Sequence, residues 1–198
     1  MRYQYGAILL LLLISLSQAS NLRRLAEEEF EFDGKYKDGK AEGKGTAKYK
    51  NGDIFEGNFK NGLRDGNGKY CYKNGNVYEG EFRDNLRDGK GKYYYKNGDR
   101  YEGDWRKGKK EGKGVYYWKG GDKFEGYFEN DKKGGYGKYY YKNGERYEGD
   151  FKNDKREGKG VYYWNDGDRS MGDYVNDKEV GLHVRLDAAG NVIEKLYD

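Results

Sequence analysis

The sequence predicts an all-β fold: an elongated, open and twisted antiparallel sheet of tandem β-hairpins without an aliphatic core. Three observations carry this prediction. The chain repeats itself every 23 residues, and the fixed positions of each repeat alternate with the period of two that strands have. Glycine and tyrosine are strongly enriched, with 33 and 23 copies among 198 residues. The mean hydropathy of -1.29 leaves few aliphatic side chains for a core, so the 17% of aromatic residues must do the packing.

The first segment differs from the rest of the chain. Residues 1–19 contain one basic side chain, Arg2, an apolar run from Ala7 to Leu16, and small residues at Ser17 and Ala19. This layout is typical of a secretory signal peptide that is cleaved after Ala19. The run of ten residues is about half of what a helix needs to span a bilayer. We therefore expect a secreted or lumenal protein, with membrane anchoring by Ala7 to Leu16 as the alternative.

A spacer at residues 20–31 precedes the repeats. Six complete units fill residues 32–169, and a degenerate seventh unit occupies residues 170–198. Positions within a unit are counted from its first residue, which is position 1. These first residues are Phe32, Phe55, Tyr78, Tyr101, Phe124, Tyr147 and Ser170.

Each unit has the pattern of a β-hairpin, so about 14 strands are expected. Position 3 is always glycine and position 5 always aromatic, which places both on one face of a strand. Glycine within a strand leaves room for a neighbouring ring to lie flat over the backbone. Asn-Gly and Asp-Gly pairs suit the positive φ angles of tight turns between the strands. They are Asn61-Gly62, Asn74-Gly75, Asn97-Gly98, Asn143-Gly144 and Asp166-Gly167.

The pattern Tyr/Phe-Glu-Gly-x-Phe-x-Asn/Asp followed by Gly-x-Gly-x-Tyr resembles the MORN (membrane occupation and recognition nexus) repeat. The likeness covers 161 of the 198 residues. It implies an elongated sheet of hairpins used for protein interaction, for dimerisation and, in some members, for association with acidic lipid. Enzymatic activity in this family belongs to attached domains, and only six residues follow Val192. We therefore expect no enzyme.

The chemical inventory points the same way. The chain has one cysteine, Cys71, and one histidine, His183, so neither an intramolecular disulfide nor a Cys/His zinc site is expected. Beyond residue 20 the only hydroxyl side chains besides tyrosine are Ser170 and Thr46, too few for a serine-based triad with its oxyanion loop. We expect no catalytic residues, no metal and no cofactor.

Charge supplies the first candidate binding site. Residues 32–146 contain 28 basic and 19 acidic residues, whereas residues 147–198 contain 8 and 12. Because the net charge of the whole chain is only +4, we expect no nucleic-acid partner. The densest basic stretch is a candidate contact for anionic lipid, with a solvated turn as the simpler interpretation. It comprises Arg106, Lys107, Lys109, Lys110 and Lys113.

A row of tyrosines supplies the second candidate. By strand alternation, position 17 points away from the aromatic position 18, and therefore away from the packed rings. We expect an exposed aromatic row there that contacts protein or carbohydrate. Its members are Tyr94, Tyr117, Tyr140 and Tyr163.

The seventh unit departs from the pattern at Ser170, His183 and Asp187 and carries aliphatic residues that the other units lack. We expect residues 170–198 to cap the last edge strand, with homodimerisation through this repeat as the alternative. The preferred function is a non-enzymatic interaction or scaffold protein of the secretory pathway. The alternatives are a peripheral membrane protein that binds anionic phospholipid, and a carbohydrate-binding protein that uses the tyrosine row.

Overall fold

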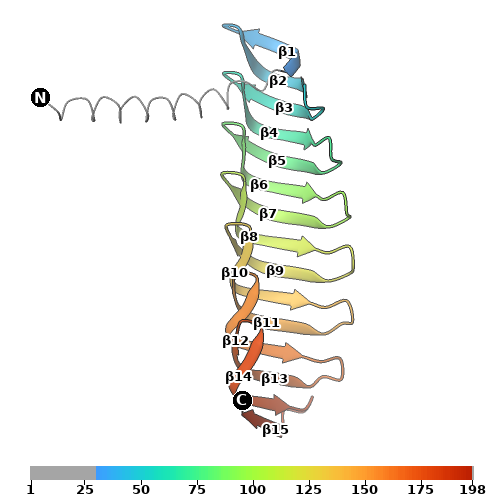
Figure 1. The fold of residues 1–198 in the computed structure, drawn as a ribbon, viewed down its shortest axis with the longest axis vertical. Coiled ribbons are helices and arrows are strands. Elements are labelled where there is room, and N and C mark those ends of the chain that lie inside the picture. Colours follow the sequence, from blue (N-terminus) through green and yellow to red (C-terminus); the bar gives the residue numbers. More distant parts are fainter. Residues whose placement is uncertain (1–29, 198) are drawn as a thin grey trace, which may run out of the picture.

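The computed structural model describes residues 30–197, which form one antiparallel sheet of fifteen strands (Figure 1). The strands lie in chain order, each paired with the next, and the sheet stays open. They are β1 (Phe30–Lys37), β2 (Lys40–Tyr49), β3 (Ile54–Lys60), β4 (Leu63–Cys71), β5 (Val77–Arg83), β6 (Leu86–Tyr94), β7 (Arg100–Arg106), β8 (Lys109–Tyr117), β9 (Lys123–Glu129), β10 (Lys132–Tyr140), β11 (Arg146–Lys152), β12 (Lys155–Tyr163), β13 (Arg169–Val175), β14 (Lys178–Leu186) and β15 (Val192–Tyr197). The predicted fold class is confirmed.

The predicted signal peptide and nearly all of the predicted spacer lie outside the described residues. Within residues 30–197 there is no helix that could cross a membrane. The sheet has one strand more than the sequence predicts, because β15 follows the seventh hairpin and pairs with β14.

The two strands of each unit are joined by a two-residue turn at positions 7 and 8. Both residues have positive φ, for instance 51° at Asn61 and 84° at Gly62. Such turns twist in the same sense as the flanking strands, which explains why Asn, Asp and Gly fill every one of these positions except Lys107.

Successive units are joined by a longer turn at positions 19 to 22. In the link that contains Asn74 and Gly75, only Gly75 has positive φ, at 91°. The Asn74 side chain instead accepts a hydrogen bond from the Asn76 N–H at 3.0 Å. The expectation of positive φ is thus right for both residues of Asn61-Gly62 but only for the glycine of the other four pairs. The longer link needs one left-handed residue, whereas the two-residue turn needs two.

The core consists of rings that lie over glycines. Tyr78 covers Gly80 and Gly91, and a Cβ placed at Gly91 would come within 2.3 to 2.6 Å of the Tyr78 phenol. The predicted pairing of rings with glycines is therefore confirmed. Apart from Ala41 and Ala47, every buried hydrophobic side chain of residues 30–197 is aromatic, so an aliphatic core is absent as predicted.

Side chains at the turns, at both ends of the strands, fix each hairpin to the next. At the linking turns, the Asp99 carboxylate accepts hydrogen bonds from the Lys119 N–H at 2.9 Å and from the Tyr116 hydroxyl at 3.0 Å. At the two-residue turns, the Asp131 carboxylate accepts one from the Lys110 N–H at 2.9 Å, and the Asp131 N–H donates to the Lys110 carbonyl at 3.1 Å. Acidic side chains at both kinds of turn therefore join neighbouring units.

The seventh unit keeps the hairpin geometry but changes the packing. Its first residue is Ser170, and His183 replaces the glycine at position 14. The His183 side chain is 2% exposed and lies over Gly172, where other units place the position 1 ring. β15 covers β14, but all six of its residues are exposed. The predicted cap therefore moves the free edge of the sheet outward instead of removing it.

Candidate functional site

The sheet has two different faces. The face that carries positions 1, 5, 10, 16 and 18 holds the packed aromatic side chains, and we call it the ring face. The face that carries positions 2, 4, 13, 15 and 17 holds mostly Lys, Asp and Glu, and we call it the charged face.

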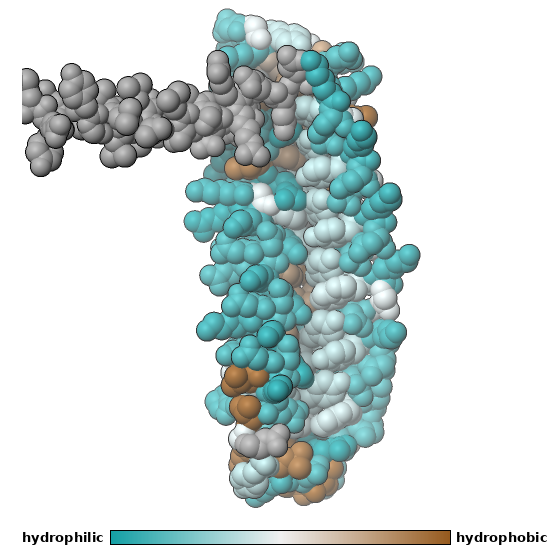
Figure 2. Space-filling model, in the orientation of Figure 1, coloured by the Kyte–Doolittle hydropathy of each residue, from teal (hydrophilic) through white to brown (hydrophobic). Residues whose placement is uncertain are grey.

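A continuous row of aromatic rings follows the ring face, and we call it the ring strip. Neighbouring ring centroids are 4.5 to 5.8 Å apart from the first member to the last. The members are Tyr49, Tyr70, Tyr72, Tyr93, Tyr95, Tyr116, Trp118, Tyr139, Tyr141, Tyr162 and Trp164. From Tyr95 onward every member is only partly buried. Figure 2 shows a column of intermediate hydropathy running along the array between two hydrophilic margins.

Hydrogen bonds hold the rings of the strip in place. The Tyr139 hydroxyl donates to the Asp122 carboxylate of the previous unit at 2.7 Å, as Tyr116 does to Asp99. Burial raises the pKa of Tyr139, and the bond to Asp122 raises it further. Burial also raises the pKa of Tyr95 to about 12. Burial therefore favours the neutral phenols of Tyr95 and Tyr139, and hydrogen bonds fix the rings of Tyr116 and Tyr139.

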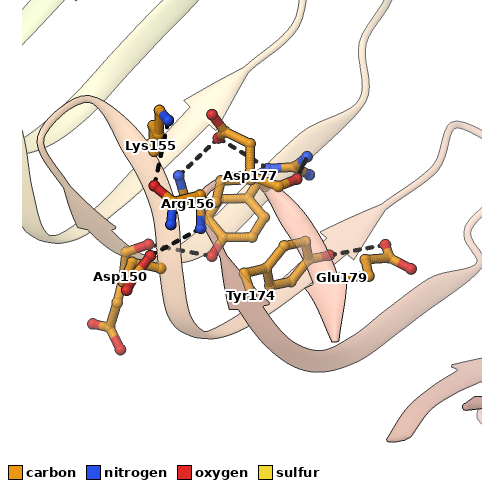
Figure 3. Close-up of polar contacts among 9 residues, drawn as sticks. Asp150, Lys155, Arg156, Tyr174, Asp177 and Glu179 are labelled. Atoms are coloured by element: carbon orange, nitrogen blue, oxygen red, sulfur yellow. Dashed lines mark hydrogen bonds and ion pairs between the residues drawn. The ribbon is translucent and has the colours of Figure 1, made fainter. Parts of the chain in front are cut away.

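A row of cations lies beside the ring strip at position 10 of units 2 to 6. Its members are Arg64, Arg87, Lys110, Lys133 and Arg156. Each lies over aromatic rings, as the Arg156 guanidinium does at 4.8 Å from the Tyr174 centroid. Each arginine also donates to a carbonyl in the turn of the next unit, and Arg156 reaches Asp177 O at 2.6 Å (Figure 3).

The two lysines of this row differ from the arginines. Lys110 Nζ lies 5.0 Å from the Tyr116 centroid, and Lys133 Nζ lies 5.0 Å from the Tyr139 centroid. Neither Nζ has a hydrogen bond or ion pair within residues 30–197. Burial lowers the pKa of both ammonium groups. The middle of the strip therefore holds two half-buried cations whose N–H donors are available to a ligand.

The structure places the predicted tyrosine row on the charged face, at the ends of β6, β8, β10 and β12, and all four rings are half-buried. Three of them lie under a cation from the neighbouring strand. Arg100 lies 4.2 Å from the Tyr117 centroid, Lys123 lies 4.1 Å from that of Tyr140, and Arg146 lies 3.7 Å from that of Tyr163. Tyr94 is the fourth member. One side of most of these rings is thus already occupied.

The predicted basic stretch is divided among three surfaces. Arg106, Lys107 and Lys109 lie together, exposed, at the turn between β7 and β8. Lys110 belongs to the cation row of the ring face. Lys113 is exposed on the charged face, opposite Tyr127 of the next strand.

Sequence reasoning missed both the ring strip and the cation row as binding surfaces. Position 10 is basic in five consecutive units, a signal that the repeats carry openly. What the sequence does not show is that these cations lie over rings of the neighbouring unit.

Cys71 is half-buried and unpaired. No group of three His, Cys, Asp or Glu side chains within the described part of the chain is placed to hold a metal ion.

Comparisons with known proteins agree with this architecture. A family model described as MORN repeat matches residues 32–54, 55–77, 78–100, 101–123, 124–146 and 147–169. No curated protein sequence matches the chain. Among solved structures, the Drosophila melanogaster SAS-4 (dCPAP) TCP domain, in complex with a proline-rich motif of Ana2, is 14% identical with a TM-score of 0.53. That match covers 85% of this chain and 90% of the TCP domain.

Two further structures match with lower scores. The G-box domain of the microcephaly protein CPAP is 10% identical, with a TM-score of 0.42 over 86% of this chain and 99% of that chain. The wild-type TCP10 domain of Danio rerio CPAP is 12% identical, with a TM-score of 0.24 over 87% and 97%. At these identities the likeness to the SAS-4 domain shows the fold alone.

Proposed function

The chain belongs to the MORN-repeat family, and we propose that it is a non-enzymatic interaction module that binds an extended acidic segment of a partner protein along its ring strip. The observation that carries this proposal is the pair of half-buried lysines, Lys110 and Lys133, beside a continuous row of rings. Apolar side chains of a partner would lie on the rings, and carboxylates would reach the two ammonium groups.

The spacing of the lysines defines the partner further. Lys110 lies on β8 and Lys133 on β10, so two strand intervals of about 4.8 Å separate them along the array. An extended segment with the threefold twist of polyproline II advances about 3.1 Å per residue and returns to the same face every third residue, so carboxylates three residues apart match the two lysines. We therefore propose a motif of the form Asp/Glu-x-x-Asp/Glu with apolar residues between the acids.

The comparison with SAS-4 supports a peptide partner. That protein's TCP domain, a sheet of similar fold, is described in complex with a proline-rich motif of Ana2. A single-layer sheet of this shape can therefore hold a short segment of another protein.

Selection from a displayed library of random 12-residue peptides tests the proposal. We expect enrichment of acids at i and i+3 with the parent chain, and loss of that enrichment with the double variant K110E/K133E. The matched control is K109E/K132E, which makes the same change of charge at exposed residues beside the turns. Enrichment that survives K110E/K133E, or no enrichment at all, contradicts the proposal.

We also propose that this module works in the secretory pathway. The support is the signal-like segment 1–19, whose apolar run has no counterpart in the repeats. N-terminal sequencing of the secreted or lumenal fraction from expressing cells is expected to give a chain that starts at Ser20. A chain that keeps Met1 and stays in the membrane fraction would favour anchoring by Ala7 to Leu16.

Lipid binding is a second candidate, favoured by basic side chains at the two-residue turn between β7 and β8. Arg106, Lys107 and Lys109 are exposed there. A secreted chain would face away from the leaflets that contain most anionic lipid, which weighs against this role. Flotation with phosphatidylserine vesicles at low salt tests it, and failure to float excludes it.

The tyrosine row remains a third candidate, for carbohydrate. Stacking on a sugar needs an open ring face, and cations already cover Tyr117, Tyr140 and Tyr163. A glycan array checks this role, and an array without hits removes it.

Homodimerisation is proposed at the other end of the chain. On β15, Val192, Ile193, Leu196 and Tyr197 are between 49% and 74% exposed, and no strand among the described residues covers the outer edge of β15. An exposed apolar edge strand is a template for pairing with a second copy. Light scattering is expected to show a dimer that the edge-charging variant I193K converts to a monomer, and a monomeric parent chain contradicts this.

A further inference from the structure

One place on the charged face breaks the pattern of the repeats. In the other five complete units, positions 4 and 13 carry charged or amide side chains, and position 13 of one unit lies opposite position 4 of the next. Lys90 thus forms an ion pair with Asp104, and Lys159 pairs with Asp173 at 3.2 Å. Among the six complete units only the fifth has rings at both positions, so this exchange needs an explanation.

In the fifth unit both positions are tyrosine. Tyr127 takes the place of the acid at position 4, and Tyr136 takes the place of the lysine at position 13. The exchange leaves Lys113 opposite Tyr127 and Asp150 opposite Tyr136. Across β8, β9, β10 and β11 the face therefore presents a cation, two rings and a carboxylate in that order, and we call these four side chains the tyrosine pair row.

The two rings of this row are open to solvent. Tyr127 is 45% exposed and Tyr136 is 52% exposed, although rings are mostly buried elsewhere in the array. They border a shallow groove of about 470 Å³ to which Val115 contributes an apolar side chain. The Tyr136 hydroxyl donates to Glu148 at 3.4 Å, whereas the Tyr127 hydroxyl has no hydrogen bond with residues 30–197.

The end charges of the row are also available. Lys113 Nζ lies 5.6 Å from the Tyr127 centroid, and neither it nor the Asp150 carboxylate forms a hydrogen bond or ion pair within the described chain. In Figure 3 the Asp150 carboxylate points away from Arg156 and Tyr174 of the ring face. The acids that border the groove already have partners, since Glu125 pairs with Lys123 at 2.8 Å. Lys113 and Asp150 are thus the two charges of the tyrosine pair row that have no ion-pair partner among the described residues.

We propose that the tyrosine pair row binds a proline-rich segment in the polyproline II conformation that carries an acidic residue at one end and a basic residue at the other. Three strand intervals of about 4.8 Å separate β8 from β11, which is about 14 Å. Polyproline II advances about 3.1 Å per residue, so an acid and a base that are five residue steps apart match this length. The acid of the segment pairs with Lys113, the base with Asp150, and the prolines lie on the two rings.

The chemistry of the face favours this occupant over other peptide conformations. Inside the sheet the backbone groups are already paired, so a partner strand cannot be added there. A helix needs a broad apolar stripe, whereas two adjacent rings and one valine form a narrow one. Polyproline II segments dock on narrow aromatic grooves and keep their carbonyls free for donors such as the Tyr127 hydroxyl. The row lies on the opposite face from the ring strip, so this inference is independent of the proposed function.

Fluorescence anisotropy with labelled synthetic peptides tests the inference. We expect saturable binding of Glu-(Pro)4-Arg, and at least tenfold weaker binding of Glu-(Gly-Ser)2-Arg, which lacks the polyproline conformation. The double variant Y127D/Y136K restores the residue types of the other units and is expected to weaken binding at least tenfold. K159E, on the same face but outside the row, is the matched control and is expected to change binding less than twofold. Near-UV circular dichroism checks that each variant keeps the fold.

A change of specificity completes the test. K113E gives the row two carboxylates, so it is expected to bind Arg-(Pro)4-Arg more tightly than Glu-(Pro)4-Arg, the reverse of the parent chain. Equal affinity of parent and Y127D/Y136K for Glu-(Pro)4-Arg overturns the inference, as does the absence of peptide binding. Tyrosine-dependent binding of cellohexaose without any peptide binding would overturn it in favour of a sugar. The outcome of the K110E/K133E selection does not bear on this row.

Discussion

His183 donates a hydrogen bond from Nε2 to the carbonyl oxygen of Asp173 at 2.8 Å. In the three earlier units that have a tyrosine at position 1, its hydroxyl donates to this position 4 carbonyl, as when Tyr78 reaches Glu81 O at 3.0 Å. The imidazole thus enters the same space from the opposite strand. Position 1 is free to be Ser170 because His183 supplies both the ring and the donor.

This exchange predicts strong coupling between the two positions. Removing the ring in His183→Gly leaves a cavity over Gly172, which we expect to lower the free energy of unfolding by about 2 kcal/mol or more. Ser170→Tyr alone places two rings in one space. The double variant S170Y/H183G restores the residues of the other units and is expected to recover stability to within about 1 kcal/mol of the parent. Urea unfolding measures all three, and additive effects would contradict the exchange.

The glycines that lie under rings predict a loss of stability when a Cβ is added. In Gly91→Ala the new Cβ meets the Tyr78 phenol at 2.3 to 2.6 Å, so we expect a loss of about 3 kcal/mol in unfolding free energy. Gly120→Ala is the matched control, because its Cβ would meet nothing within 4 Å. The control is expected to stay within about 1 kcal/mol of the parent. Equal effects of the two substitutions in urea unfolding would show that the ring does not need the bare backbone.

The two-residue turns predict an order of stability among substitutions at Asp131. Its φ is 71°, and its carboxylate accepts a hydrogen bond from the Lys110 N–H. Asp131→Ala keeps the Cβ in the left-handed conformation and loses the hydrogen bond, about 1 kcal/mol, whereas Asp131→Gly loses the same bond but relieves the left-handed Cβ, which offsets about 1 kcal/mol. Thermal unfolding is expected to place the glycine variant close to the parent and the alanine variant below both. An alanine variant as stable as the glycine variant would contradict this account.

Buried phenols predict a loss of stability at high pH. Burial raises the pKa of Tyr95 from 10.0 to about 12 in the folded chain, because it disfavours the phenolate. The unfolded chain therefore loses its proton first as the pH rises. This stability is complete below pH 10 and falls as the pH rises towards 12. Urea unfolding between pH 8 and 12, with phenolate absorbance as a second probe, checks this, and constant stability over that range would contradict it.

The position of Lys133 predicts that its substitution weakens peptide binding without destabilising the fold. Lys133→Met removes the half-buried charge but keeps a flexible apolar side chain against Tyr139 and Phe151, so we expect less than about 1 kcal/mol change in unfolding free energy. Binding of Asp/Glu-x-x-Asp/Glu peptides is expected to weaken at least fivefold. Arg156→Met, which loses the bond to Asp177 O, is expected to be clearly less stable. A Lys133→Met chain as unstable as Arg156→Met would mean that the lysine serves the fold.

Individual residues show which parts of the structure could be predicted from the sequence. The repeat period and the glycine at position 3 predicted the hairpins and the ring over Gly80, because strand alternation follows from spacing alone. The cation over Tyr163 could not be predicted, because it comes from Arg146, the last residue of the preceding unit, and depends on cross-strand register. The position of Lys110 on the ring face also depends on the bulge of the hairpin, where the register shifts between Gly103 and Trp105.

The identical pairing of every unit with the next has a consequence for chain length. Each hairpin ends in the register in which the following one begins, with Tyr78 opposite Tyr70 just as Tyr101 is opposite Tyr93. A duplication or deletion of one whole unit therefore rebuilds the same junction. It changes the distance between the two ends by two strand intervals, about 9.6 Å. The length of the array can therefore change in fixed steps without a new core having to evolve.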